Sequence, residues 1–323
     1  MATDVDLSVI IVNWNSKEFL RKCVCSLEEQ TRGVRMEIVV IDSGSFDGSG
    51  DMLAQEFPDV RFIQSDKNLG FARGNNVAAR SATGRFLVFL NPDTELRGPA
   101  LNKLFEAAVS LPKAGALGAH LLNSDGTVQT SCLQSFPTVA NQVLDADVLR
   151  KWFPRSRLWG MAALYAGATE PAEVEGISGA CLVTPRALFE QLGGLNEGYF
   201  MYYEDMDYCL KVQRAGWKNY YVPAAVIVHH GGKSAGGEHS RFSSVMMAES
   251  GWRFFRTHHG AAQAAVFRVS LAVKAALRLV VLLLLCLVPL SEARRKWAKS
   301  ALGKWNCVLR WAFGGEKEIA NLR

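Results

Sequence analysis

The sequence lacks the cysteine pattern of a disulfide scaffold or of a zinc site. Its seven cysteines are odd in number and scattered, and none shows the spacing of zinc ligands. Cys23 and Cys25 lie inside an amphipathic helical pattern, where a thiol usually packs into the core. We therefore expect reduced thiols in a cytosolic compartment rather than a disulfide-linked secreted domain.

Three other signals are missing, and each absence removes a class of protein. The N-terminus has no basic segment or cleavage site, so we expect no secretory signal. No internal repeat or low-complexity segment is present, which excludes a repeat array. No G-x-G-x-x-G follows the first apolar run, where a Rossmann dehydrogenase needs it. Trp14 stands there instead, and its bulk would keep a pyrophosphate away from the backbone. The same turn, NWNS, is also not the Gly-rich, basic loop that a nucleotidyltransferase needs after its first strand.

Positive charge is scarce outside the C-terminal tail. The 323 residues have a net charge of +5, but the residues after Gly260 hold 11 Lys and Arg against 3 Asp and Glu, so residues 1–260 stand at −3. Nucleic-acid-binding proteins more often have their basic patch on the folded domain, so we expect no nucleic-acid partner. A basic, apolar tail favours an anionic membrane surface. We expect a globular domain over residues 1–260 and a membrane-associating helical tail over residues 261–323.

Apolar runs alternate with amphipathic helical patterns along most of the chain. Strands are expected at residues 7–12, 37–41, 60–63, 86–90, 114–120, 177–183 and 220–228. The β-α-β alternation through the first four of them predicts a parallel, doubly wound sheet. Residues 86–90 are all aromatic or branched apolar residues, which indicates a strand buried on both faces.

Polar side chains follow three of these strands at the point where each strand ends. Asn13 and Asn15 follow the first strand, and Asp42 follows the second. Asp93 follows the strand at residues 86–90, which must end at Pro92 because proline cannot donate to a sheet ladder. Open α/β sheets bind ligands at the carboxyl ends of their strands. A carboxylate there suits a divalent cation that carries phosphates; the alternative for Asp93 is an Asx turn that only caps the strand.

A second acidic cluster opens the helix expected after residue 203. Glu204, Asp205 and Asp207 follow three aromatic residues, which exceeds what compensation of a helix dipole requires. Carboxylates beside apolar rings take up protons more readily, and this suits a general base. Further along, His229 stands at the end of the strand at 220–228 and precedes a Gly pair, which makes it a candidate metal ligand.

Two further segments are candidates for binding phosphate-bearing ligands. Gly70 lies at a helix start with Arg73 nearby, as expected of a phosphate site. Residues 121–175 are the least regular part of the chain and mix aromatic with basic residues. This mixture predicts either a surface helical excursion or a docking surface for an amphiphilic, phosphate-bearing acceptor. The candidate acceptor contacts are Trp152, Arg155, Arg157 and Trp159.

Taken together, these segments resemble family 2 glycosyltransferases of the GT-A fold, in the bacterial rhamnosyltransferase-like branch. The matching segments occur in family order over about residues 7–235 and read SVIIVNWN, VVIDSGSFDGS, NLGFARGNN, FLVFLNPDTEL, ISGACLVTPRALFEQLGGLNEGYFMYYEDMDYCLKVQRAGW and VIVHHGGKS. The resemblance implies an α/β GT-A fold, with a Rossmann-like mixed central sheet flanked by helices. It also implies sugar transfer from a nucleoside-diphosphate donor, with inversion at the anomeric carbon and with Mg²⁺ or Mn²⁺ as cofactor.

The resemblance assigns roles to individual residues. Asp205 matches the family's catalytic base, and Glu204 would help to place the acceptor. Asp93 stands in the metal-binding motif, where Asn91 replaces the first acid, so the metal would rest on Asp93 and His229. Contacts with the donor are implied for Asn13, Asn15, Asp42, Ser43, Asn68, Gly70, Arg73, Asn75, Asn91 and Asp93. Ser43 replaces the Asn that the family usually has at this position.

The partners follow from the same resemblance. The family branch implies dTDP-rhamnose as the donor, with UDP-sugars next. A polyprenyl-diphosphate-linked acceptor fits a membrane-attached enzyme at the cytoplasmic face of the inner membrane, in the assembly of a cell-surface polysaccharide such as lipopolysaccharide O-antigen. The sequence leaves open whether the chain forms a homo-oligomer. The competing hypothesis is a non-catalytic sugar-nucleotide-binding scaffold subunit, but a scaffold needs none of Asp93, Asp205 and His229.

The tail has two apolar segments of different character. Residues 271–290 are apolar except for Lys274 and Arg278, and the uncharged part is only 12 residues long, short of the roughly 20 that span a bilayer. The whole segment would span if both basic side chains snorkel. Residues 291–313 mix basic residues with tryptophans, as interfacial helices do. We expect two amphipathic helices in the cytoplasmic leaflet; one crossing helix and a soluble dimerisation hairpin are the alternatives.

Overall fold

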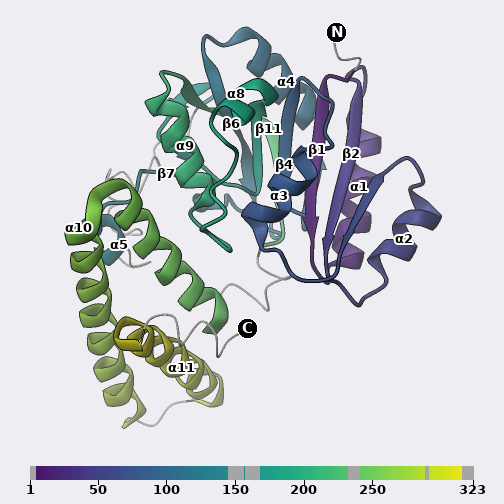
Figure 1. The fold of residues 1–323 in the computed structure, drawn as a ribbon. Coiled ribbons are helices and arrows are strands. Elements are labelled where there is room, and N and C mark those ends of the chain that lie inside the picture. Colours follow the sequence, from purple (N-terminus) through teal and green to yellow (C-terminus); the bar gives the residue numbers. More distant parts are fainter. Residues whose placement is uncertain (1–4, 145–155, 157–167, 232–240, 288–290, 315–323) are drawn as a thin grey trace. The chain divides into compact units, whose positions relative to one another are not determined.

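The computed structural model describes residues 5–144, 156, 168–231, 241–287 and 291–314. The chain divides into two units (Figure 1). Unit 1 comprises Met1–Phe136, Ala146–Phe200 and Glu204–Ser234, and unit 2 comprises Pro137–Asp145, Met201–Tyr203 and Ala235–Arg323. Three residues from the middle of the chain, Met201–Tyr203, therefore group with the C-terminal helices and not with the residues on either side of them.

Unit 1 is built on one large sheet with the strand order β3-β2-β1-β4-β10-β6-β11-β5, and β8 pairs with β11. The strands are β1 (Leu7–Asn13), β2 (Met36–Ser43), β3 (Arg61–Ser65), β4 (Phe86–Leu90), β5 (Thr94–Arg97), β6 (Ala114–Leu122), β8 (Ala172–Val174), β10 (Cys181–Pro185) and β11 (Lys218–His229). All five residues of β4 are buried, which confirms the strand predicted to be covered on both faces. A separate two-stranded sheet pairs β7 (Leu133–Gln134) with β9 (Gly176–Ile177).

The sheet is mixed, as the family resemblance implied. Strands β3, β2, β1 and β4 run parallel to one another, so the doubly wound prediction is correct for this half of the sheet. Strand β10 runs antiparallel to both β4 and β6, which the simple alternation did not predict. The long excursion after β6 replaces the short crossover helix that makes consecutive strands parallel, so the direction of β10 is not constrained in that way.

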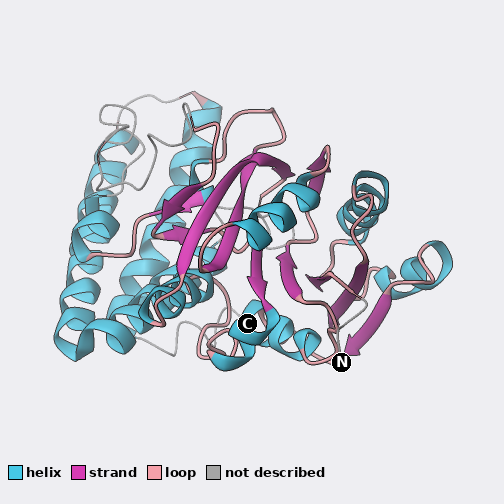
Figure 2. Cartoon of the chain, turned by 90° about the horizontal axis from the view of Figure 1, so that it is seen from above, coloured by secondary structure: helices cyan, strands magenta, loops and turns pink. Residues whose placement is uncertain are grey.

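Helices lie on both faces of the sheet (Figures 1 and 2). They are α1 (Lys17–Gln30), α2 (Ser49–Glu56), α3 (Phe71–Ala79), α4 (Ala100–Ser110), α8 (Arg186–Gln191) and α9 (Glu204–Arg214). The buried face of α1 holds Leu20, Cys23, Val24 and Leu27, which confirms the predicted apolar face and the packing role of Cys23. The sequence pattern is reliable here because one apolar stripe of a helix must face the core.

Three local features of the structure were not predicted from the sequence. The strand expected at residues 177–183 is two strands, because the backbone turns away at Ser178–Ala180 between β9 and β10. Strand β5 begins directly after Asp93 and was not predicted, since it is a short edge strand with two charged residues. Ser16 occupies the N-cap of α1, but its hydroxyl donates to the Trp14 carbonyl, and the Lys17 N–H is bound by Asp47 Oδ2 at 2.8 Å.

Unit 2 consists of α5 (Val139–Leu144), α10 (Arg241–Cys286), α11 (Glu292–Gly314) and the segment Met201–Tyr203. The first tail helix begins at residue 241, about 30 residues before the apolar segment predicted at 271–290. The helical path of α10 breaks at Gly260, where φ is 87°. The domain boundary at residue 260 stays a prediction.

The break at Gly260 reverses the chain. The rings of Phe255 and Phe267 stack with centroids 4.8 Å apart. In a straight helix two residues twelve positions apart lie about 18 Å apart along the axis, so this contact requires the two arms of α10 to fold back on each other. Helix α11 packs onto the same arms: Trp311 Nε1 donates to Glu249 Oε2 at 2.9 Å, and the Arg268 guanidinium lies 5.2 Å from the Trp311 ring.

Candidate active site

The carboxyl ends of β1 and β2 share a polar network centred on the Asp42 carboxylate. Asn13 pairs in register with Asp42, and its side-chain Nδ2 donates to Asp42 Oδ1 at 2.8 Å. Asp42 also accepts from the Ser45 backbone N–H and from Gln64 Nε2, and it is only 1% exposed. Contact between Asp42 and a donor base, which the resemblance implies, therefore requires one of these bonds to yield.

Two other predicted donor residues stand beside this network. Asn15 adopts φ 48°, its backbone N–H donates to Ser45 Oγ at 2.8 Å, and its Oδ1 accepts from the Phe46 N–H at 3.0 Å. Ser43 is buried, and its hydroxyl has no hydrogen-bond partner among the residues that the structure describes. The loop after β2 is thus shaped by Asn15 and Ser45, while the Ser43 hydroxyl keeps its hydrogen-bonding capacity.

The start of α3 is a narrow turn made by Gly70. Its φ is 74°, and a Cβ at this position would lie 2.4 Å from the Phe200 carbonyl oxygen, so only glycine fits. Asn68 Oδ1 accepts from the Gly70 N–H at 2.9 Å and stabilises the turn. Arg73 stands in the first turn of α3 with 55% of its side chain exposed, and its Nε lies 3.9 Å from Glu197 Oε2. Asn75 is fully buried and donates to the Phe71 carbonyl, while its Oδ1 has no hydrogen-bond partner among the described residues. Its contact with the donor stays a prediction.

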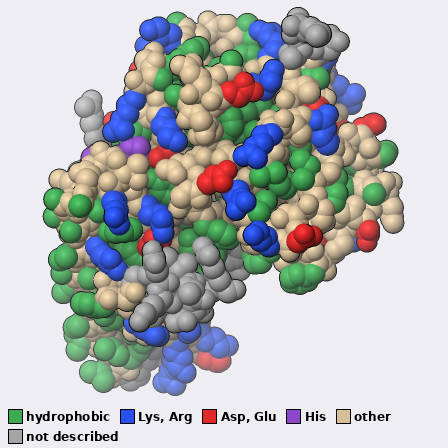
Figure 3. Space-filling model, in the orientation of Figure 1, with side chains coloured by type: hydrophobic (Ala, Val, Ile, Leu, Met, Phe, Trp, Pro, Cys, Tyr) green, Lys and Arg blue, Asp and Glu red, His purple; other side chains and the backbone are tan. Residues whose placement is uncertain are grey.

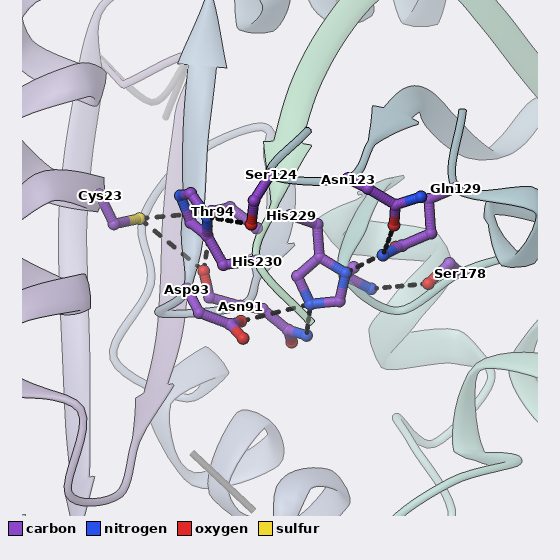
Figure 4. Close-up of polar contacts among 11 residues, drawn as sticks. Cys23, Asn91, Asp93, Thr94, Asn123, Ser124, Gln129, Ser178, His229 and His230 are labelled. Atoms are coloured by element: carbon purple, nitrogen blue, oxygen red, sulfur yellow. Dashed lines mark hydrogen bonds and ion pairs between the residues drawn. The ribbon is translucent and has the colours of Figure 1, made fainter. Parts of the chain in front are cut away.

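Asp93 and His229 meet at the ends of β4 and β11, as the sequence predicted (Figure 4). Asp93 Oδ1 lies 3.3 Å from His229 Nε2. Asp93 is 2% exposed, and its Oδ2 has no hydrogen-bond partner among the described residues. Because an unpaired buried carboxylate oxygen is costly, this atom marks a position where a cation would be stabilising.

Gln129, which the sequence did not single out, fixes the state of the His229 ring (Figure 4). The Gln129 Oε1 lies 2.7 Å from His229 Nδ1, and Gln129 Nε2 donates to Asn123 Oδ1, so the amide presents its oxygen to the ring. His229 Nδ1 must then carry the proton. On the other side Asn91 Nδ2, which can only donate, lies 3.1 Å from His229 Nε2. Nε2 is therefore the ring nitrogen that faces Asn91 and Asp93, and it is the atom through which His229 could bind a metal ion.

These residues fit a hard divalent cation with few protein ligands. No group of three His, Cys, Asp or Glu side chains that could hold a metal ion occurs in the described part of the chain. Mg²⁺ and similar ions commonly take one or two carboxylates and complete their shell with water and substrate phosphates. Asp93 Oδ2 and His229 Nε2 offer such a partial site.

The turn Ser178–Ala180 connects this corner to the second acidic cluster. The Asn91 N–H donates to the Ala180 carbonyl at 3.0 Å. One residue earlier, the Gly179 N–H donates to Asp205 Oδ2 at 2.8 Å, and a Cβ on Gly179 would lie 3.4 Å from Asp205 Cβ. The break between β9 and β10, which the sequence did not predict, is therefore what holds Asp205 at the same corner of the sheet as Asn91.

Glu204 and Asp205 have different environments at the start of α9. Burial raises the pKa of Glu204 well above its ordinary value, neighbouring Asp205 adds to the rise, and Glu204 Oε2 has no partner among the described residues. Burial also raises the pKa of Asp205, but the N–H groups of Gly179 and Met206 oppose the rise by stabilising its charge. A proton shared by the pair therefore resides on Glu204, and Asp205 is the member that stays ionised, as a general base requires.

The remaining predicted residues cannot be placed. Trp152, Arg155, Arg157 and Trp159, the expected acceptor contacts, lie outside the described residues. Gln129 belongs to the irregular stretch 121–175, for which the sequence predicted a surface helical excursion or a docking surface and no part in a metal site. No local pattern identifies it, because its partner His229 is 100 residues further along the chain.

Comparison with known proteins gives results at three levels. A family model described as Glycosyl transferase family 2 matches residues 8–191. The chain is 32% identical over 272 residues to the N-acetylglucosaminyl-diphospho-decaprenol L-rhamnosyltransferase of Mycobacterium tuberculosis. The aligned region covers 77% of this chain and 87% of that protein. It is 20% identical over 231 residues to the rhamnosyltransferase WbbL of Escherichia coli K12, which covers 69% of this chain and 82% of that protein.

A solved structure shares the fold. The mannosyltransferase PcManGT of Pyrobaculum calidifontis, in complex with GDP-Man and Mn²⁺, superposes with a TM-score of 0.55 at 19% identity. The match covers 97% of this chain and 91% of that one. The mixed α/β, GT-A-like fold that the resemblance implied is therefore confirmed.

Proposed function

The chain belongs to glycosyl transferase family 2, and from this premise we propose that it is an inverting rhamnosyltransferase. Its donor is dTDP-rhamnose, with UDP-sugars as the alternative. Its acceptor is a polyprenyl-diphosphate-linked saccharide in the assembly of a cell-surface polysaccharide. The mycobacterial relative is named for a rhamnose transfer to a decaprenol-linked N-acetylglucosamine, which supports both substrates.

The observation that carries the proposal is the turn Ser178–Ala180. It binds the Asp205 carboxylate on one side and the Asn91 backbone, at the end of β4, on the other. A base and a phosphate-side site at one corner of the sheet are what a single displacement requires.

The chemistry follows from these positions. Asp205 accepts the proton of the acceptor hydroxyl while the hydroxyl oxygen attacks the anomeric carbon. The bond between that carbon and the diphosphate oxygen breaks as the new bond forms on the opposite face, so the configuration inverts. A Mg²⁺ or Mn²⁺ ion held by Asp93 and His229 would neutralise the charge that develops on the departing diphosphate. Arg73, exposed at the start of α3, is available to bind a phosphate oxygen.

The direct test combines donor binding with transfer. We expect dTDP-rhamnose to raise the melting temperature of the detergent-purified chain in the presence of Mn²⁺, because a ligand at 100 times its Kd stabilises by about 2.7 kcal/mol. Rhamnose should then be transferred to polyprenyl-diphosphate-linked N-acetylglucosamine. UDP-sugars and GDP-mannose serve as donor controls. Binding without transfer to any lipid-linked acceptor would favour the scaffold hypothesis, and the absence of binding by every donor would refute the proposal.

We further propose that the tail attaches the protein to the cytoplasmic leaflet of the inner membrane. One helix in the described part of the chain, α10, is long and apolar enough to cross a membrane, and only 11% of its most apolar window is buried. Large apolar side chains such as Leu277 and Leu284 are 63% and 59% exposed. Figure 3 shows hydrophobic side chains gathered over this part of α10. Helix α11 adds exposed basic residues, which favour anionic lipids.

Vesicle flotation tests this attachment. The full chain is expected to float with vesicles that contain anionic phosphatidylglycerol and to float less at high salt, because surface charge contributes to binding. Leu277→Glu with Leu284→Glu should abolish flotation. Val109→Glu is the matched control, since Val109 on α4 is 55% exposed but lies in unit 1. Release from membranes by a carbonate wash would support two helices in one leaflet, whereas retention would indicate a crossing helix. A chain that ignores vesicles and dimerises would support the hairpin alternative.

A further inference from the structure

Both basic side chains of the apolar segment in α10 lie beside one ring of α11. Lys274 Nζ is 6.0 Å from the centroid of the Trp305 ring, and Arg278 Cζ is 5.6 Å from it. Lys304, the neighbour of Trp305 on α11, places its Nζ 5.7 Å from the same centroid. A cation within about 6 Å of an aromatic centroid is attracted to the ring. All these residues belong to unit 2, in which α11 lies beside α10 (Figure 1).

The positive charge around this ring is not matched by acids of the same helices. The second arm of α10 (residues 261–286) and α11 together contain nine Lys and Arg but a single acid, Glu292. Lys274 and Arg278 are four positions apart on one helix, where like charges repel each other. Arg278 is exposed, and it makes no hydrogen bond or ion pair with any residue that the structure describes. An anion bound beside Trp305 would relieve this repulsion.

Lys274 is already ordered before any ligand arrives. Its Nζ donates to the Gln142 carbonyl of α5 at 3.0 Å, and α5 also belongs to unit 2. The side chain is therefore held both by the Trp305 ring and by this hydrogen bond. Because ordering flexible side chains is one of the costs of binding, a lysine that is fixed in advance favours the capture of an anion.

The cluster lies at the edge of an apolar stripe on the second arm of α10. The exposed apolar side chains of this arm recur every three or four positions and therefore share one helix face; they are Val266, Val269, Val273, Leu277, Val280 and Leu284. Lys274 and Arg278 each follow a member of this stripe directly, so their side chains leave the helix about 100° round its axis from the stripe. A helix with this stripe among acyl chains would hold both cations at the level of the headgroups.

We propose that Trp305, Lys274 and Arg278 form a binding site for the headgroup phosphate of an anionic membrane phospholipid. The ring holds the two cations together, and the Arg278 guanidinium offers parallel N–H groups to two phosphate oxygens. The apolar stripe beside the site favours a lipid over a free phosphate ion, because a lipid in the membrane brings its phosphate to this edge of the helix. This inference rests on the proposed attachment of the tail to a membrane, and it replaces a diffuse attraction of charges by one saturable site.

A titration followed at the tryptophan side chains tests the site directly. The full chain, isotope-labelled at its indole nitrogens and held in neutral detergent micelles, is titrated with short-chain phosphatidylglycerol and followed by NMR. The Trp305 signal, identified by its loss in Trp305→Phe, is expected to shift and to saturate. Trp297, which is 62% exposed on α11, provides the control signal and should show no saturating shift. Arg278→Gln should weaken the affinity measured at Trp305 by about tenfold or more. An unchanged affinity in this variant would overturn the proposal.

Vesicle binding distinguishes a site from diffuse attraction. Trp305→Leu removes no charge, yet it should weaken binding to phosphatidylglycerol vesicles by about two- to tenfold, and Trp305→Tyr, which keeps an aromatic face, should retain most of the binding. The losses caused by Trp305→Leu and Arg278→Gln should not be additive, because both residues belong to one site. Arg294→Gln is the matched control for charge, since Arg294 is exposed on α11 and eleven positions from Trp305. Its loss should add to that of Trp305→Leu. Additive losses in both pairs would contradict a single site.

Two further ligands identify the source of the phosphate. Inorganic phosphate that saturates the Trp305 signal as well as the lipid does would show that the site is not specific for lipids. Tighter saturation by a short-prenyl diphosphate would assign the site to the acceptor instead, and either result would overturn the assignment to a phospholipid. If the wild type binds no vesicles, the proposed attachment fails, and the micelle titration still decides whether the cluster binds a lipid phosphate.

Discussion

Replacing Asp205 by Asn is expected to lower the rate of transfer by about 10²–10⁴-fold while donor binding is retained. The amide cannot accept the proton of the acceptor hydroxyl, yet it keeps the size of the carboxylate. The measurement compares kcat with the donor-induced shift in melting temperature, which should match that of the wild type. Turnover at the wild-type rate in this variant would remove Asp205 from the role of base.

Glu204→Gln is the matched control, because the neighbouring residue is expected to be neutral during catalysis. A glutamine mimics the protonated Glu204, so this variant should keep most of the wild-type kcat. In the wild type and in Glu204→Gln, activity should fall as the pH is lowered, because protonated Asp205 cannot act as a base. Since burial raises the pKa of Asp205 above its ordinary value of 3.8, the loss should occur at a higher pH than for an exposed aspartate.

The same variant tests the protonation of Glu204 through stability. The pKa of Glu204 is raised in the folded state, so the folded chain retains a proton that the unfolded chain releases above the ordinary value of 4.5. Stability contributed by this group therefore falls as the pH rises through that interval. Glu204→Gln lacks the penalty, and its gain in melting temperature over the wild type should grow between pH 5 and pH 8. A difference that does not change with pH would contradict the assignment of the proton.

The second large effect is expected at the metal corner. Asp93→Asn should lower transfer by about 10²–10³-fold, since it removes the carboxylate that would hold the cation. Without the cation, the charge that develops on the departing diphosphate is not neutralised. Removal of divalent ions with EDTA should cause a comparable loss in the wild type, reversible by Mn²⁺. Full activity of the EDTA-treated wild type would show that no divalent cation is needed.

Gln129 gives this prediction a readout in metal binding itself. Gln129→Leu removes the acceptor that holds the His229 proton on Nδ1, and second-shell changes of this kind weaken metal affinity by about 10–100-fold. Gln129→Glu keeps an acceptor in the same place and should restore most of the affinity. Gln134→Leu is the matched control, because the Gln134 side chain donates to the Ser131 carbonyl and not to the His229 ring. Equal Mn²⁺ affinity in all three variants, measured by titration, would exclude Gln129 from the second shell.

Much of the fold could be predicted because it depends on local patterns. The apolar face of α1 and the limits of β4 follow from apolar periodicity and from Pro92, since each element must place its apolar side chains in the core. Edge strand β5 was missed because its residues have no apolar alternation that a pattern could detect. The antiparallel direction of β10 was missed because it depends on the path of a long connection.

The candidate site was predictable only in part. The strand ends identified Asp93 and His229, since buried strands that stop at polar residues deliver them to one edge of the sheet. The pairing of these two with Gln129 was not predictable, because three segments far apart in the sequence meet only after β4, β6 and β11 take their places in the sheet.

The sequence by itself determined the family, the apolar cores of the elements and the identity of the acidic and histidine side chains, because periodicity and motifs are carried by neighbouring residues. The tertiary structure alone decided which atoms of those side chains are free to act. Gly179 and Gln129 hold Asp205 and His229 from distant parts of the chain. The physical reason is that the charge and tautomer of a buried group depend on its hydrogen-bond partners, and those are set by folding and not by sequence spacing.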